Sequence, residues 1–186
     1  MNLKEKYKKE IITELQKKFG YKNKMAVPAI KKVVVNSCFG KSIIGKTGSE
    51  REKIQNIIMQ DLALITGQKP VLIKSKKSIA GFKLRENLEI AAKTTLRKQK
   101  MWDFIERTIF LSLPRSRDFK GINPKSIDKN GNLNIGFKEH IMFPEIFTEK
   151  EKTIFGLEIT FSSTAKNKEE GMELYKLLGF PIKENK

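Results

Sequence analysis

Residues 88–97 alternate between apolar and polar side chains, and this stretch constrains the fold more than any other feature of the sequence. One side of the alternation is apolar, and the other side carries Glu89, Ala91, Lys93, Thr95 and Arg97. Successive side chains of a β-strand point to opposite faces, so the pattern predicts a strand that is buried on one face only. Buried parallel strands have no such polar face. The stretch therefore predicts a largely antiparallel sheet with one open face.

The remaining periodicities predict further strands and four helices. Short or alternating apolar runs predict strands at residues 33–35, 71–73, 133–137 and 157–161. Apolar residues at helical spacing predict helices over residues 3–19, 50–66, 101–113 (closed by Pro114) and 168–178 (capped by Asn167 and Glu170). The segments 39–49, 74–87 and 115–131 are predicted to be loops. We expect a single α+β domain over residues 1–186, with helices packed in a second layer and long basic loops.

The charge balance points to a polyanionic partner. The chain has 38 Lys and Arg against 21 Asp and Glu, a net charge of +17. Such an excess favours nucleic acid first and an acidic membrane second. The first helix carries Glu5, Glu10 and Glu14 on its polar face, which disfavours the membrane alternative. No apolar run approaches the length of a membrane span, and the N-terminal residues do not resemble a signal peptide, so a cytoplasmic protein is expected.

An octapeptide matches the phosphate-loop pattern at every defined position. Residues 40–47 read GKSIIGKT, and they lie between a predicted strand and a predicted helix. A working phosphate loop also needs a metal-binding Asp at the end of another apolar strand. No predicted strand ends that way, so we favour a basic surface loop. A small nucleotidase or kinase built on Gly40 to Thr47 is the alternative from the enzyme class.

The single Cys and the single His carry little chemistry. One Cys cannot form an internal disulfide, and one Cys with one His cannot assemble the usual zinc site. Nucleophilic catalysis needs a base and an orienting group within reach. Cys38 has no such neighbour in sequence, and Glu139, directly beside His140, would point to the opposite face of a strand. We therefore expect a structural Cys, an ordinary surface His, no catalytic residues, no metal and no cofactor.

Two loops concentrate basic residues with few acids among them, and each also carries an aromatic residue. The first holds Lys74, Lys76, Lys77, Lys83 and Arg85 with Ile79 and Phe82; the second holds Arg115, Arg117, Lys120 and Lys125 with Phe119. Basic side chains bind phosphates, and an interleaved aromatic can stack on a base. We favour nucleic-acid contact over a merely solvated face. The polar face of residues 88–97 (Lys93, Thr95, Arg97) is a third candidate, for which simple exposure to water stays an equal alternative.

Several longer sequence segments of the chain resemble bacterial-type large-subunit ribosomal protein five, the 5S-rRNA-binding protein of the central protuberance. They occur in order as LALITGQKP (62–70), KSKKSIAGFKLR (74–85), TTLRKQKMWDF (94–104), LPRSRDFKG (113–121), NGNLNIGFKEHIMFPEI (130–146), GLEITFSSTAK (156–166) and LLGFPIK (177–183). Together they cover nearly the whole chain. The stretch 86–92 departs from the family, which often has Gly and Pro there.

The resemblance implies a non-enzymatic ribosomal protein in the cytoplasm. Its expected partners are 5S rRNA, large-subunit rRNA, P-site tRNA, small-subunit ribosomal protein thirteen and other central-protuberance proteins. The family's 5S rRNA contacts correspond to Asn36 after the first strand, Gln68, Thr95 and Arg97, to which the strand face adds Lys93. The tRNA-proximal loop corresponds to Lys74, Lys76, Lys77, Ser78, Phe82, Lys83 and Arg85. Further basic RNA contacts are expected at Arg115, Arg117 and Lys120.

Overall fold

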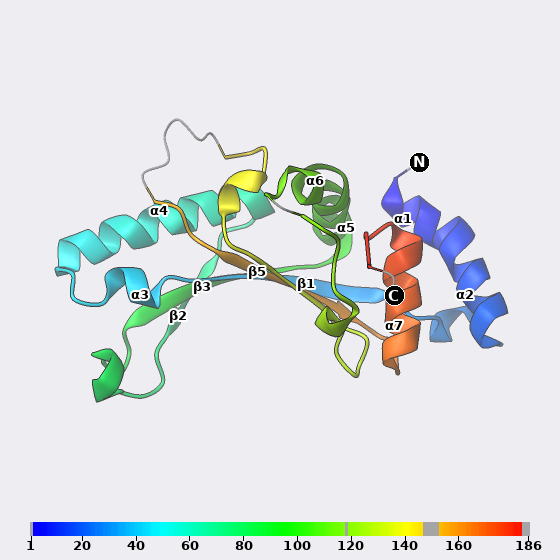
Figure 1. The fold of residues 1–186 in the computed structure, drawn as a ribbon, viewed down its shortest axis with the longest axis horizontal. Helices are drawn as coiled ribbons and strands as arrows, with labels where there is room; N and C mark the ends of the chain where they lie inside the picture. The colour runs from blue at the N-terminus through cyan, green and yellow to red at the C-terminus, as the bar shows by residue number, and fades with distance from the viewer. Residues whose placement is uncertain (1, 118, 147–152, 184–186) are drawn as a thin grey trace. The chain divides into compact units, whose positions relative to one another are not determined.

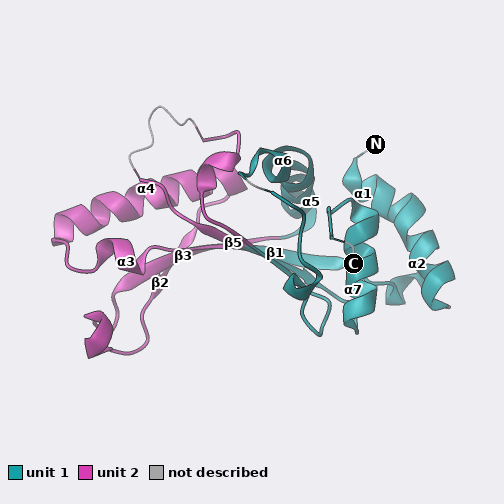
Figure 2. Cartoon of the chain, viewed as in Figure 1, with its two compact units in different colours: residues 1–34, 97–135, 159–186 teal, residues 35–96, 136–158 magenta. Residues whose placement is uncertain are grey.

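A computed structural model describes residues 2–117, 119–146 and 153–183. The fold is α+β, with a five-stranded antiparallel sheet in the order β2-β3-β1-β5-β4 (Figure 1), which confirms the predicted class. The strands are β1 (Ile30–Cys38), β2 (Val71–Lys74), β3 (Glu89–Leu96), β4 (Leu133–Phe137) and β5 (Leu157–Ser163). The chain divides into two compact units (Figure 2): unit 1 holds residues 1–34, 97–135 and 159–186, and unit 2 holds residues 35–96 and 136–158.

The N-terminal helix of unit 1 follows the predicted range. It comprises α1 (Leu3–Lys6), a π-helical turn (Tyr7–Ile11) and α2 (Ile12–Phe19), and it ends where Gly20 adopts a positive φ of 70°. Its apolar face packs inward: the Tyr7 ring lies 5.4 Å from Trp102, and the Tyr7 hydroxyl donates to the Pro28 carbonyl at 2.9 Å. Burial raises the pKa of Tyr7 to about 12.

The second helical segment of unit 1 is longer than predicted. It comprises α5 (Lys98–Arg107), a π-helical turn (Thr108–Ser112) and α6 (Leu113–Arg115). The expectation that Pro114 closes this helix was wrong. Pro114 lies within α6, and the helical segment ends one residue after it, at Arg115.

The last helix, α7 (Lys168–Leu178), packs against the turn that precedes β4. A Cβ at Gly171 would lie 2.5 Å from the Cα of Gly131, so neither position has room for a side chain. The Tyr175 hydroxyl donates to the Phe161 carbonyl of β5 at 2.8 Å. Asn167 is the N-cap as predicted, but the Glu170 carboxylate accepts from the Lys166 N–H instead of from Asn167.

Unit 2 is built on α4 (Gly48–Thr66), which packs against β3 (Figure 1). Ile58, Leu62 and Ile65 are fully buried along its inner face. Gln55, which the periodicity did not single out, is also buried and donates to the Glu89 carbonyl at 3.3 Å. The expected loop at 39–49 is partly helical, because Gly40–Ile43 form α3. None of the described helices is long and apolar enough to cross a membrane.

Candidate nucleic-acid interface

The polar face predicted for β3 is open in the structure. Ala92, Thr94 and Leu96 are at most 2% exposed on the inner face, whereas Lys93 is exposed and Thr95 is half-buried on the outer face. Strand β2 pairs with β3 in an antiparallel register that sets Val71 opposite Lys93. The outer face therefore combines an exposed β-branched residue with a cation and a hydroxyl.

Gln68 lies next to the end of β3, just after the end of α4. Gly67 ends the helix with a positive φ of 63°, and the Gln68 side-chain amide then donates to the Thr95 carbonyl at 3.3 Å. The Thr66 hydroxyl donates to the Gln68 carbonyl at 3.0 Å and so ties the backbone of this turn to the helix end. Two residues that lie 27 positions apart in sequence are thus neighbours in space.

Asn36 lies on the same face, within β1 and not after it as predicted. The Phe39 N–H donates to the Ile90 carbonyl at 3.0 Å, and antiparallel pairing continued from this bond sets Asn36 on the side of Lys93. The Asn36 Oδ1 atom is buried and has no hydrogen-bond partner among the described residues.

Arg97 is the first residue beyond β3 and not part of the strand. It is exposed, and its extended backbone (φ −142°) makes it the N-cap residue of α5. The next residue, Lys98, adopts a positive φ of 54°, which turns the chain sharply from strand to helix. Of the three residues predicted to share one strand face, Lys93 and Thr95 lie on β3, and Arg97 lies just beyond its end.

The basic loop between β2 and β3 is an internally bonded hairpin. The buried Ser75 hydroxyl donates to the Arg85 carbonyl at 2.6 Å and accepts from the Leu88 N–H at 3.1 Å. The Ser78 hydroxyl accepts from the Glu86 N–H at 2.9 Å. The basic residues of the hairpin are all exposed: Lys74, Lys76, Lys77, Lys83 and Arg85.

The hairpin tip displays an aromatic ring. A 3₁₀ turn over Ala80–Phe82 is followed by Lys83 in the left-handed region (φ 49°). Phe82 is 69% exposed, although the Ile79 N–H donates to the Leu84 carbonyl at 2.9 Å directly beneath the tip. A ring held in water above a hydrogen-bonded base is available for stacking.

The second basic segment lies in unit 1. Arg115, Arg117 and Lys120 are exposed, as predicted. Backbone bonds from the Ile122 N–H to the Pro181 carbonyl (2.8 Å) and from the Lys183 N–H to the Ile122 carbonyl (2.9 Å) hold the end of this loop. Hydrogen bonds at Ile122 therefore hold the backbone that follows these basic residues.

The phosphate-loop pattern does not form a phosphate site. Thr47 is the N-cap of α4, and its N–H (3.1 Å) and its hydroxyl (2.9 Å) both donate to the Glu50 carboxylate. The backbone bond from Thr47, followed by the hydroxyl bond, lowers the pKa of Glu50, so the group stays an anion. The Thr47 N–H and hydroxyl, which a phosphate and Mg²⁺ would need, are thus occupied by the chain's own carboxylate. Within the described ranges, no three His, Cys, Asp or Glu side chains gather into a metal site.

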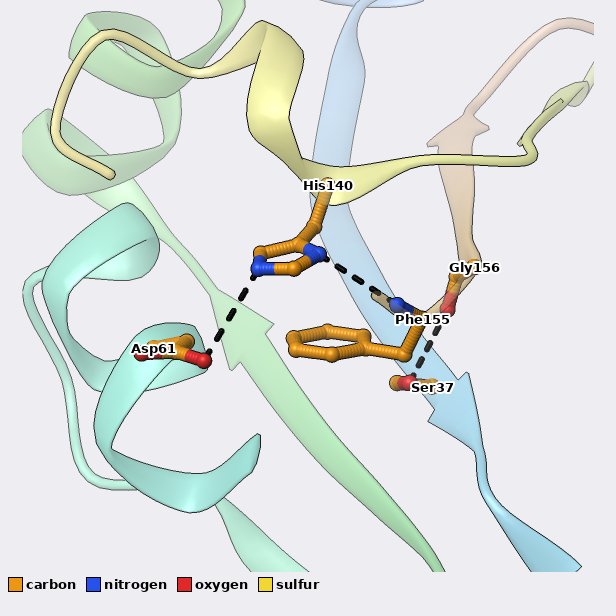
Figure 3. Close-up of polar contacts among 5 residues, drawn as sticks. All are labelled: Ser37, Asp61, His140, Phe155 and Gly156. Atoms are coloured by element: carbon orange, nitrogen blue, oxygen red, sulfur yellow. Dashed lines mark hydrogen bonds and ion pairs between the residues drawn. The ribbon is translucent and has the colours of Figure 1, made fainter. Parts of the chain in front are cut away.

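The expectation of a surface His was wrong. His140 is fully buried between α4 and the segment that precedes β5 (Figure 3). Its ring stacks on Phe155 with centroids 3.9 Å apart, its Nδ1 accepts from the Phe155 N–H at 3.4 Å, and its Nε2 lies 3.8 Å from an oxygen of Asp61. The apolar residues that follow it in sequence, Ile141 to Phe143, were the signal for burial.

Two family models match consecutive parts of the chain. The model described as "Ribosomal protein L5" matches residues 23–85, and the model that describes the C-terminus of the same ribosomal protein family matches residues 89–182. The first includes the hairpin and Gln68, and the second includes Lys93, Thr95 and Arg97.

Curated proteins are similar over almost the full length. A protein named large ribosomal subunit protein uL5 from Halothermothrix orenii is 48% identical over 180 residues, covering 97% of each chain. Its namesake from Dichelobacter nodosus is 49% identical over 177 residues, covering 95% of this chain and 96% of the relative. A third, from Geotalea uraniireducens, is 48% identical over 181 residues, covering 97% and 98%.

Proposed function

The chain belongs to the ribosomal protein L5 family, and from that premise we propose that it binds 5S rRNA through the open face of β1, β2 and β3. Family membership makes it a non-enzymatic structural constituent of the large ribosomal subunit, with rRNA and ribosomal proteins as partners. The contact face and the identity of the RNA are our proposal.

The observation that carries the proposal is the gathering of polar residues around the outer face of β3. Lys93 and Thr95 lie on that face, Asn36 lies on the same side of β1, and Gln68 bonds to the Thr95 carbonyl. Amide side chains offer both a donor and an acceptor, a hydroxyl offers both in one atom, and Lys neutralises phosphate. The wide, shallow minor groove of an RNA helix displays 2′-hydroxyls and base edges to such a surface. Arg97, directly after β3, adds a planar fork suited to phosphate or guanine.

The other basic regions serve further partners in this proposal. The hairpin from Lys74 to Arg85 reaches P-site tRNA, and Arg115, Arg117 and Lys120 contact large-subunit rRNA. The assembled protein anchors 5S rRNA in the central protuberance, contacts other proteins there and bridges to small-subunit ribosomal protein thirteen. Family resemblance and exposed positive charge support these assignments.

Equilibrium binding to 5S rRNA and to tRNA in moderate salt tests the proposal. We expect clear preference for 5S rRNA, because polar contacts and shape discriminate where charge alone does not. The double variant Lys93→Ala/Thr95→Val should lose that preference. Lys53→Ala removes an exposed charge from α4, away from the open face, and should keep it. Equal affinity of the parent for all structured RNAs would overturn the proposal.

A further inference from the structure

Two serine hydroxyls hold a single peptide group in the hairpin between β2 and β3. The Ser75 hydroxyl donates to the Arg85 carbonyl at 2.6 Å, and the Ser78 hydroxyl accepts from the Glu86 N–H at 2.9 Å. That carbonyl and that N–H belong to one peptide bond, which joins Arg85 to Glu86. A peptide group is planar, so two hydrogen bonds to its opposite edges fix the orientation of the whole plane. We refer to Ser75 and Ser78 as the serine clamp.

Ser75 is an integral part of the base of the hairpin. It is 5% exposed, and its hydroxyl also accepts from the Leu88 N–H at 3.1 Å. In a regular antiparallel pair this N–H would bond to the Ser75 carbonyl. Here that carbonyl accepts from the N–H of Asn87, which has a positive φ of 61°, so the hydroxyl takes the place of the carbonyl. Alanine at position 75 would remove the bonds to both the Arg85 carbonyl and the Leu88 N–H.

The serine clamp acts on one cation of the hairpin and not on its neighbours. The Cα of Arg85 lies in the clamped plane, so the clamp determines where this side chain leaves the backbone. No backbone hydrogen bond holds Lys76 or Lys77 within the described part of the chain. The Arg85 side chain is exposed, and no carboxylate of the described residues pairs with it. A planar guanidinium bonds two phosphate oxygens only in a defined orientation, whereas an ammonium acts as a point charge.

We propose that Ser75 and Ser78 are positioning residues that orient the Arg85 guanidinium toward one phosphate of the RNA that the hairpin contacts. This inference rests on the proposed contact of the hairpin with P-site tRNA, and it specifies which cation makes a fixed contact there. Lys76 and Lys77 contribute positive charge without a fixed direction. The clamp and Arg85 lie wholly within unit 2 (Figure 2).

A double-mutant cycle on the affinity of P-site tRNA for reconstituted ribosomes tests the proposal. Arg85→Ala should lower the affinity by about tenfold, the effect of losing a charged hydrogen bond. Ser75→Ala should lower it by about threefold, within the range of coupling inside one network. Because Ser75 acts through Arg85, the double variant should lose no more than Arg85→Ala alone. Ser75→Thr keeps a hydroxyl and should restore the parent affinity.

Lys77→Ala is the matched control, since it removes an exposed cation that the clamp does not hold. Its loss should be smaller than that of Arg85→Ala, and it should multiply with the loss in Ser75→Ala. Independent losses for Ser75→Ala and Arg85→Ala, or equal losses for Lys77→Ala and Arg85→Ala, would overturn the proposal and leave the tRNA contact standing. If no hairpin variant weakened tRNA binding, the proposed tRNA contact itself would fall, and the role of Arg85 with it.

Amide hydrogen exchange of the purified protein tests the clamp without RNA. The amides of Glu86 and Leu88 should exchange at least about tenfold more slowly than those of Lys76 and Lys77, which have no bond to protect them. Ser78→Ala should remove the protection at Glu86, and Ser75→Ala should remove it at Leu88. Equal exchange of all four amides in the parent protein would overturn the clamp, whatever the tRNA measurements give.

Discussion

Two exposed phenylalanines in this chain have opposite surroundings. Phe82 is 69% exposed at the tip of a hairpin whose charged residues from 74 to 85 are all basic. Phe110 is 61% exposed on a helix that carries both signs of charge: Asp103, Glu106 and Arg107 precede it, and Arg115 follows it. The rings are equally available, so the neighbouring charges decide which class of partner each one suits.

The comparison separates what exposure shows from what charge shows. Exposure of a large ring indicates that a surface contacts something. A purely cationic setting then favours a polyanion, on whose bases the ring can stack. A setting of mixed sign favours a protein, because the carboxylates repel phosphates at short range. Because the whole chain has a net charge of +17, acidic residues near an exposed ring say more about its partner than the overall excess of positive charge does.

Salt should produce the largest effect on the cationic side of the comparison. Affinity for 5S rRNA should fall with rising salt, with a slope of about −0.7 to −0.9 per neutralised phosphate, or about a thousandfold between roughly 50 and 200 mM for six contacts. Lys93→Ala should reduce the slope by about one contact, and Phe110→Ser should not change it. A salt titration of the binding constant measures both, and a smaller slope in Phe110→Ser would place RNA at Phe110.

A core substitution shows whether the surfaces depend on the packing beneath them. His140→Ala removes a ring stacked on Phe155 and should lower the free energy of unfolding by about 3 kcal/mol, as for other large buried side chains. Denaturant unfolding measures this effect. Lys138→Ala, an exposed neighbour, should change stability by less than about 0.5 kcal/mol. Loss of RNA affinity by His140→Ala while it is still fully folded would show that the open face is not independent of this cluster.

Arg97 sharpens the contrast between a fixed contact and a general positive field. Arg97→Ala should weaken 5S rRNA binding by about 1–3 kcal/mol, the range for a charged hydrogen-bond partner. Arg117→Ala removes the same charge from the second basic segment and should cost isolated 5S rRNA binding less. Equal losses in the two variants would mean that net charge, and not position, governs the affinity.

The hairpin should have almost no effect on isolated 5S rRNA binding. Shortening it around Ile79-Ala80-Gly81 removes the turn that presents Phe82 and leaves the bonds of Ser75 at its base. We expect near-parental 5S rRNA affinity and reduced P-site tRNA occupancy on reconstituted subunits. If the shortened protein lost 5S rRNA while Arg97→Ala kept it, the two surfaces would have been assigned the wrong way round.

Lys46→Ala should have the smallest effect. The phosphate-loop pattern predicts that this lysine is essential, whereas the Thr47–Glu50 bonds predict that no nucleotide binds. Neither the parent nor the variant should bind ATP or GTP, with or without Mg²⁺, in an equilibrium assay. Saturable binding by the parent that disappears in Lys46→Ala would restore the enzyme alternative.

Local patterns predicted the parts of the fold that depend on local chemistry. The alternation over residues 88–97 predicted both β3 and its open face, and Gly67 and Gly179 end helices with positive φ values of 63° and 96° as their positions suggested. The pattern misplaced the end of β3, because the backbone turns from strand to helix within one residue. Arg97 continues the alternation of the strand, but it is the N-cap residue of α5.

Sequence patterns could not predict contacts between residues that lie far apart in the chain. The apolar residues after His140 signalled its burial, but nothing near it in sequence names its neighbours Asp61 and Phe155. Ser75 looks like one more polar residue of a basic loop, yet its hydroxyl joins Arg85 and Leu88. Of the 5S rRNA candidates, the strand period could place Lys93 and Thr95 together, but only the folded chain brings Gln68 beside them.

The capping bonds at the start of α4 make Glu50 a tethered competitor for that helix end. A free anion would have to displace a carboxylate three residues away along the same chain, whose effective local concentration is in the millimolar range or higher for so short a tether. A phosphate group at this helix end would therefore have to compete with Glu50 for the Thr47 N–H and hydroxyl. A Glu placed three residues after the final Ser or Thr of a phosphate-loop match thus marks a site that is already filled from within.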